Sequence, residues 1–116
     1  MRHEVKKISK MVDELTTFFL EHEAKNLNIK IDNLEDREII TVEAVALDDI
    51  NLCVDNLKDF LSYPRECEME EYFWGLAGEI DSSPELGLVG TMIDEANIGY
   101  EDDKILLELI RNKMRK

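Results

Sequence analysis

Two glycines at the start of an expected helix could do chemistry in this sequence. The segment SPELGLVGTMIDEA, residues 83–96, places Gly87 and Gly90 near the start of an expected helix, close to the free amides of its first turn. Such amides can bind a phosphate, and glycine lets the phosphate approach the backbone. The same glycines could instead let a neighbouring element pack closely. Glu85 favours close packing, because its carboxylate competes for the amides and repels an anion within a screening length of about 8 Å.

An acidic segment offers a second chemistry. Glu66 and Glu70 are four residues apart, so they share one face of an expected helix, where two carboxylates could hold Mg²⁺ or Ca²⁺. The other interpretation is a solvated helix face, on which like charges at this spacing cost only about 0.2–0.5 kcal/mol. No converging histidines or aspartates can be placed beside the pair. We therefore expect no metal site, with a carboxylate-based metal-dependent enzyme as an alternative.

Aromatic residues offer contacts to a partner protein. Tyr72, Phe73 and Trp74 are consecutive, so they cannot all face one side of a helix. Phe73 fits the core stripe, which leaves Tyr72 and Trp74 as candidate partner-binding residues at the rim, unless they pack beneath the adjoining loop. Phe18 is a further candidate, because with Phe19 it widens the apolar stripe of the first expected helix. That helix either forms a homodimer or is covered by the sheet.

The two cysteines, Cys53 and Cys67, show no metal-binding pattern. They have neither CxxC spacing nor a nearby histidine pair, which argues against a zinc site. The opening MRHEVKKISK is charged and helical rather than apolar, so we expect no signal peptide, a cytoplasmic location and two reduced thiols. No run of about 18 apolar residues occurs, so we expect no membrane-spanning segment.

The charge balance restricts the partners. The chain has 116 residues, the size of a single domain at 1–116, and carries 27 acidic against 14 basic residues for a net charge of −13. Nucleic-acid binding draws most of its affinity from Lys and Arg at phosphates, and no basic stripe crosses this sequence. We therefore expect neither nucleic acid nor a membrane surface as a partner, and we expect a protein partner, with a basic one favoured by the charge.

Hydrophobic periodicity predicts the elements that position these residues. Apolar residues recur at three- and four-residue steps in the helical segments and alternate in the hairpins. The expected elements are a helix at 3–24, a hairpin at 28–46, helices at 50–62, 65–77 and 83–96, and a hairpin at 98–110. This order, αββαααββ, predicts an α+β (α/β) two-layer sandwich in which helices cover one face of a four-stranded, mostly antiparallel sheet.

Finer features follow from the same patterns. Ile40, Val42 and Ala44 alternate with more polar residues, so one face of the first hairpin is expected to be buried and the other wetter. Asp48 or Asp49 is expected to cap the helix at 50–62.

The layout resembles the C-terminal part of the GHKL ATPases, the superfamily of histidine-kinase ATP domains and anti-sigma-factor kinases. ELGLVGTMIDEANIGYEDDKILLELI, residues 85–110, is similar to that family's last motif helix and final strands. DELTTFFLEHEAKNLNIKI, residues 13–31, is similar to its first motif helix and hairpin. PRECEMEEYFWGLAGE, residues 64–79, is similar to a segment of a small group of uncharacterised bacterial proteins. The resemblance implies a nucleotide loop at Glu85, Leu86, Gly87, Leu88 and Gly90.

The departures from the family pattern concern its nucleotide machinery. The family's first motif holds magnesium with an asparagine, and Phe18 stands at the matching position. The chain leaving the hairpin reads VEAVALDDI, without the spaced glycines of the second motif, and Glu85 replaces the first glycine of the last motif. We therefore expect a regulatory or scaffold module that binds a protein rather than an enzyme, with a vestigial nucleotide loop and no cofactor. The alternative is an active ATP- and magnesium-binding protein of the anti-sigma or histidine-kinase type.

Overall fold

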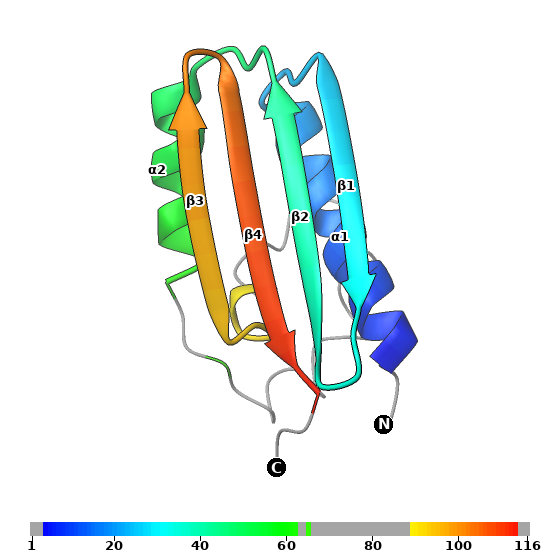
Figure 1. Ribbon diagram of the computed structural model, residues 1–116. Coiled ribbons are helices and arrows are strands. Elements are labelled where there is room, and N and C mark those ends of the chain that lie inside the picture. The colour runs from blue at the N-terminus through cyan, green and yellow to red at the C-terminus, as the bar shows by residue number, and fades with distance from the viewer. Residues whose placement is uncertain (1–3, 63–64, 66–88, 114–116) are drawn as a thin grey trace.

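The chain forms an α+β fold with one four-stranded antiparallel sheet (Figure 1). The computed structural model describes residues 4–62, 65 and 89–113. Its elements are α1 (Glu4–Glu21), β1 (Asn26–Asn33), β2 (Arg37–Val45), α2 (Ile50–Phe60), β3 (Glu95–Glu101) and β4 (Lys104–Asn112). The strand order is β1-β2-β4-β3, so the two hairpins meet where β2 pairs with β4. Both described helices lie on the same face of the sheet, α1 behind β1 and β2 and α2 behind β3 and β4.

Helix α1 packs its apolar stripe onto the sheet. Residues at three- and four-residue steps along it are buried, which is the pattern expected of a helix with one covered face. The buried apolar residues of α1 are Ile8, Met11, Leu15, Phe18 and Phe19. The helix ends without a glycine, because Glu23 adopts a left-handed backbone conformation with a φ of 67°, and the Ala24 amide donates to the Phe19 carbonyl at 3.1 Å.

The strands alternate between a buried and an open face, as the sequence predicts. On β2, Ile40, Val42 and Ala44 are buried against the helices, and the residues between them are half-buried on the open face. The β4 residues Ile105, Leu107 and Leu109 continue the same buried layer across the sheet. The core therefore lies between one sheet face and the two described helices.

Helix α2 begins where a cap was expected. Asp49 is the N-cap residue, and its Oδ1 atom accepts a hydrogen bond from the Leu52 amide at 3.1 Å. The sequence alone left the choice between Asp48 and Asp49 open. The buried face of α2 consists of Cys53, Val54 and Leu57.

The predicted helix at 83–96 is wrong at its C-terminal end. Only residues 89–90 of its described part are helical, the Met92 amide donates to the Val89 carbonyl at 2.9 Å, and β3 begins at Glu95. Asp94 starts the sheet pairing, because its amide donates to the Ile110 carbonyl at 2.8 Å and its carboxylate accepts from the Asn112 amide at 2.7 Å. Cross-strand hydrogen bonds therefore replace the helical ones three residues earlier than the hairpin was expected.

Candidate functional site

Most of the sequence-predicted site residues lie outside the described part of the chain. They comprise four residues of the vestigial nucleotide loop, both carboxylates of the metal alternative, two aromatic candidates and one cysteine. These residues are Glu85, Leu86, Gly87, Leu88, Glu66, Glu70, Tyr72, Trp74 and Cys67. The expected helix at 65–77 also falls there, apart from Arg65. Their roles stay predictions.

Gly90 is the described member of the glycine pair, and it packs against the end of α2. A Cβ atom at this position would lie 2.5 Å from the Phe60 carbonyl oxygen and 3.4 Å from the Leu61 Cα. Both neighbours are backbone atoms of the α2 C-terminus, which cannot move aside as a flexible side chain could. Close approach of two backbones therefore accounts for a glycine at this position.

Phe18 belongs to the core. It is 3 % exposed, and its ring meets those of Phe19 and Phe60 edge-on, with centroids 5.2 and 6.2 Å apart. His22 lies against the same ring at a centroid distance of 4.6 Å. The first helix was expected either to form a homodimer or to be covered by the sheet, and in the structure the sheet covers its apolar stripe. The expected contact of Phe18 with a partner protein is therefore corrected: Phe18 is a core residue. A buried ring offers no surface to another protein.

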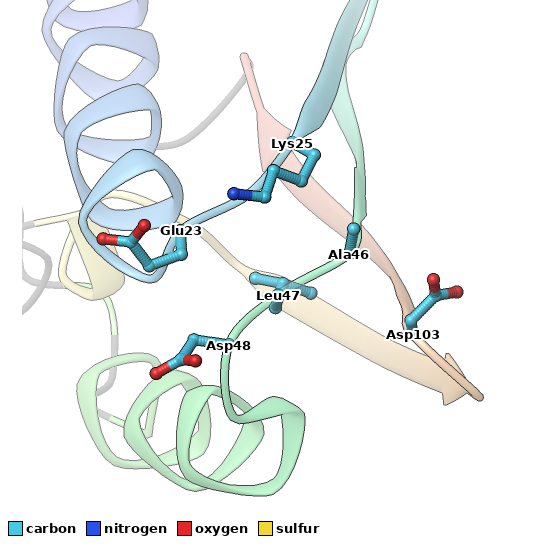
Figure 2. A pocket seen from close by; sticks show the side chains of 6 residues that line it. All are labelled: Glu23, Lys25, Ala46, Leu47, Asp48 and Asp103. Atoms are coloured by element: carbon cyan, nitrogen blue, oxygen red, sulfur yellow. The ribbon is translucent and has the colours of Figure 1, made fainter.

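A hollow of about 510 Å³ lies at the end of the sheet where α1 ends and α2 begins (Figure 2). Three segments surround it, and it is lined by Glu23, Lys25, Ala46, Leu47, Asp48 and Asp103. Backbone hydrogen bonds hold the segments together: the Ala46 amide donates to the Asp103 carbonyl at 2.7 Å and the Asp48 amide to the His22 carbonyl at 3.1 Å. Ala46 has a φ of 62°, a conformation that L-residues rarely adopt.

The charges of the hollow oppose an anionic ligand. Its charged lining residues are three acidic ones, Glu23, Asp48 and Asp103, and one basic one, Lys25. Within residues 4–62, 65 and 89–113, no three His, Cys, Asp or Glu side chains are arranged to hold a metal ion. The lining of the hollow therefore does not favour an anionic ligand.

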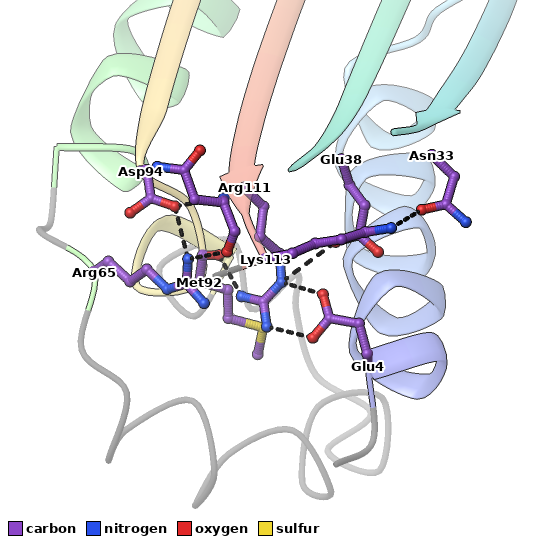
Figure 3. A network of polar contacts seen from close by, with 9 residues as sticks. Glu4, Asn33, Glu38, Arg65, Met92, Asp94, Arg111 and Lys113 are labelled. Carbon is purple, nitrogen blue, oxygen red and sulfur yellow. Dashed lines mark hydrogen bonds and ion pairs between the residues drawn. The ribbon is translucent and has the colours of Figure 1, made fainter. Parts of the chain in front are cut away.

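The opposite end of the core contains a buried ionic cluster formed by Glu4, Glu38 and Arg111 (Figure 3). Arg111 is 3 % exposed and binds Glu4 through two hydrogen bonds, from Nε to Oε2 at 2.8 Å and from one terminal nitrogen to Oε1 at 3.0 Å. Its other terminal nitrogen donates to the Met92 carbonyl at 2.6 Å. The guanidinium thus joins α1, β4 and the segment before β3.

Glu38 shares this guanidinium with Glu4. Its Oε1 atom lies 3.8 Å from the Arg111 Nε, and that buried oxygen accepts no hydrogen bond. Burial, together with the neighbouring Glu4 carboxylate, raises the pKa of Glu38 to about 7. The hydrogen bonds from Arg111 lower the pKa of Glu4 to about 2. Near neutral pH Glu4 is therefore ionised and Glu38 is only partly protonated, so Glu38 is the carboxyl group of the pair that titrates there.

Arg65 forms a second link near the same end of the sheet. One of its terminal nitrogens donates to Asp94 Oδ2 at 2.6 Å and to the Asn112 carbonyl at 3.1 Å (Figure 3). The side chains of Arg65 and Asp94 are both largely buried. This ion pair joins Arg65, beyond α2, to the end of the sheet where β3 begins and β4 ends.

The ionic cluster could have been predicted from the sequence, because Glu38 and Arg111 occur at positions where the strand alternation places buried residues. Glu38 continues the buried series of Ile40, Val42 and Ala44, and Arg111 continues that of β4, so both point to the core. They are also direct cross-strand partners. A charged residue in phase with a buried strand face indicates a buried partner, because an unpaired charge there is strongly destabilising.

The two edges of the sheet differ in charge. β3 forms one edge and β1 the other. The β3 edge, residues Glu95–Glu101, carries two glutamates and no basic residue. β1 carries both Lys30 and Asp32, whose Nζ and Oδ2 atoms lie 3.8 Å apart. The β3 edge is therefore acidic, while the charges of β1 balance.

Comparison with known proteins gives no assignment. No family model, curated protein or solved structure matches this chain. In the part of the chain that the structure describes, no helix has both the length and the apolar character needed to cross a membrane.

Proposed function

We propose that this chain is a small cytoplasmic regulatory or scaffold module that acts by binding another protein. In this proposal it is a degenerate GHKL domain, a two-layer sandwich whose nucleotide machinery has been lost. The observation that carries the proposal is the burial of Phe18, the residue at the position of the family's magnesium-binding asparagine. A phenyl ring offers no oxygen to a magnesium ion, and this ring is enclosed by Phe19, Phe60 and His22.

The acidic hollow supports the loss of nucleotide binding. The segment VEAVALDDI, which replaces the family's aspartate–glycine motif, contributes Ala46, Leu47 and Asp48 to its lining. A triphosphate there would approach an excess of carboxylates in a chain whose net charge is −13. The ring of Phe18 and the acidic lining of the hollow thus argue against magnesium and a triphosphate at these two places.

Exposed apolar side chains support protein binding. Tyr100 on β3 is 52 % exposed and Leu106 on β4 is 49 % exposed. Leu52, in the first turn of α2, is also exposed. Leu106 lies on the open face of the sheet, Tyr100 points to the helix-covered face, and the elements that carry the three residues, α2, β3 and β4, are neighbours (Figure 1). Aromatic and aliphatic residues in such a position contribute apolar area to a protein interface.

Thermal unfolding in the presence of nucleotides and divalent ions tests the loss of nucleotide binding. A ligand at one hundred times its Kd stabilises the native state by about 2.7 kcal/mol, so saturating ATP with Mg²⁺ would raise the Tm measurably if it bound. We expect no change. A rise that the variant Gly87→Trp abolishes would overturn the proposal in favour of an active ATP-binding protein. A rise with Mn²⁺ or Ca²⁺ alone, abolished by Glu66→Gln, would establish the metal-dependent alternative.

Protein binding requires its own experiment. A tagged copy is purified from cells that produce the chain naturally, and each copurifying protein is then titrated in purified form against the purified chain by calorimetry. We expect at least one saturable complex. If no purified candidate binds the chain directly, the proposal of a protein-binding module is wrong.

A further inference from the structure

We infer that the β3 edge binds an extended, basic segment of a partner protein, which adds to the sheet as a fifth strand. This inference rests on the proposed protein-binding function and names both the site and the chemistry of the partner. Strand addition of this kind gains affinity from main-chain hydrogen bonds and specificity from alternate side chains. The four observations that carry it are the open edge, its charge, a gap at Gly99 and the exposed apolar residues around it.

The β3 edge is available for pairing among the described residues. β3 pairs with β4 over its whole length, from Glu95 opposite Ile110 to Glu101 opposite Lys104. No described strand pairs with its other side. Natural proteins protect such edges with charged side chains, above all lysine, with proline or with a bulge, and the two glutamates of β3 would repel an acidic strand but not a basic one. β3 has neither a lysine nor a proline, and its register with β4 runs without a break.

The charge of this edge selects a basic occupant. Glu95, Asn97 and Glu101 are exposed and share the open face of the sheet, since alternate residues of a strand point the same way. The Asn97 amide nitrogen lies 3.4 Å from the Glu95 carboxylate and 3.0 Å from that of Glu108 on β4, and so bridges two acidic groups without neutralising them. Neither Glu95 nor Glu101 forms an ion pair with a described residue.

Gly99 leaves a gap in the middle of the edge. A Cβ atom at this position would meet only the Leu106 carbonyl oxygen, at 4.0 Å, so the space above the glycine is open. Leu106 is the direct cross-strand partner of Gly99, and its side chain is half exposed beside that gap. An apolar side chain of a fifth strand opposite Gly99 would therefore reach across the glycine and cover Leu106.

The other face of the same edge is apolar. Ala96, Ile98 and Tyr100 point to the helix-covered side, and Tyr100 is more than half exposed at the end of the sheet where α2 begins. A fitting segment therefore alternates: basic residues lie opposite Glu95 and Glu101, a large apolar residue lies opposite Gly99, a polar residue lies opposite Asn97, and apolar residues lie opposite Ala96, Ile98 and Tyr100. The two glutamates thus determine the residues at the ends of the partner segment, and the open space at Gly99 determines the residue near its centre.

A synthetic peptide tests the inference. The probe is a fluorescein-labelled heptapeptide of sequence Lys-Val-Leu-Val-Thr-Val-Lys, which matches the seven residues of β3 when it aligns antiparallel and places its leucine opposite Gly99. Its binding to the full chain is measured by fluorescence anisotropy. We expect saturable binding that weakens with added salt, because the charged groups are exposed. Amide chemical shifts are expected to change at residues 95–101 and to stay constant at residues 26–33. Failure of this peptide to bind would overturn the inference.

Matched charge reversals separate the edge from general attraction to an acidic protein. Glu101→Lys and Asp32→Lys change the net charge equally but lie on opposite edges. We expect Glu101→Lys to raise the Kd about tenfold, because it places like charges opposite each other, and Asp32→Lys to change it less than about twofold. The milder Glu101→Gln should fall between the native chain and Glu101→Lys. Equal weakening by Glu101→Lys and Asp32→Lys would contradict a site at β3.

Backbone methylation tests strand addition itself. Methyl groups on alternate peptide nitrogens remove the donors on one edge of the peptide only, so one of the two alternating sets should abolish binding and the other should leave it intact. Equal effects of the two sets would show that no strand is added. A natural partner that binds Glu101→Lys as tightly as the native chain would refute this inference alone, and the proposed protein-binding function would stand.

Discussion

Arg111 and Glu4 are 107 residues apart in the sequence and form a two-pronged ion pair, with nitrogen–oxygen distances of 2.8 and 3.0 Å. This contact joins the beginning of α1 to the end of β4 and places the Glu38 carboxyl group beside an already neutralised guanidinium. When Glu38 ionises, it adds a second negative charge beside a guanidinium that Glu4 already pairs. The stability of the fold should depend on how that second charge titrates.

Glu38→Gln should abolish one pH dependence of the free energy of unfolding. The pKa of Glu38 is raised from 4.5 to about 7 in the folded chain, so its stabilising contribution is complete below pH 4.5 and is lost as the pH rises through 7. A shift of this size corresponds to about 3 kcal/mol. Urea denaturation at pH 5 and pH 8 should show similar stabilities for variant and native chain at pH 5, and a more stable variant at pH 8.

The exposed Glu35→Gln, in the turn between β1 and β2, is the matched control for that change. It removes one carboxyl group at the surface and should leave the pH profile of the native chain unaltered. Parallel profiles for the native chain and Glu38→Gln would contradict the assignment of the proton to Glu38.

Arg111→Met should destabilise the fold strongly at neutral pH. The substitution keeps an unbranched apolar stem but leaves the Glu4 carboxylate without its partner in a largely buried site, which typically costs about 3–5 kcal/mol. The loss should shrink at low pH, where Glu4 can be protonated. Chemical denaturation at pH 7 and pH 4 measures both effects, and the exposed Arg37→Met serves as the control. A loss below 1 kcal/mol at pH 7 would be the magnitude of a surface ion pair and would contradict the buried cluster.

Gly90→Ala should destabilise the fold although alanine favours helices. The new Cβ atom would lie 2.5 Å from the Phe60 carbonyl oxygen, and overpacking of this kind costs about 1–3 kcal/mol. Gly99→Ala is the control, because its Cβ atom would meet nothing closer than 4.0 Å. Thermal denaturation should show a lower Tm for Gly90→Ala and an unchanged or higher Tm for Gly99→Ala. A higher Tm for Gly90→Ala would show that α2 does not approach this glycine.

The Cys53 thiol should be unreactive in the folded chain. It is fully buried, and burial raises its pKa to about 12, so almost no thiolate forms at neutral pH. In a Cys67→Ser background, where Cys53 is the one remaining cysteine, labelling by iodoacetamide at pH 7.5 should be slow in buffer and complete in denaturant. Equal labelling rates under the two conditions would contradict the burial of Cys53.

The helix-covered layer could be predicted from the sequence because it depends on local periodicity. The alternation of Ile40, Val42 and Ala44 fixed the buried face of β2, and the three- and four-residue spacing in α1 fixed its buried stripe. The end of the expected helix at 83–96 could not be located, because Ile93 and Ala96 fit a helical stripe as well as a strand. The helix ends before Asp94 because Asp94 forms hydrogen bonds with Ile110 and Asn112, which are distant in the sequence.

The candidate site likewise combines features that the sequence predicted with features that only the tertiary structure determined. Composition alone determined that the chain is strongly acidic and lacks a basic stripe for nucleic acids. Tertiary structure alone decided that β3 becomes an edge, that Gly99 opens a gap beside Leu106, and that Glu38 meets Glu4 around Arg111. Periodicity reports which face of an element is buried, since burial acts residue by residue along a helix or strand. The order of the strands and the partner of a buried charge depend on contacts between segments that are distant in the sequence. A local pattern of residues therefore cannot predict them.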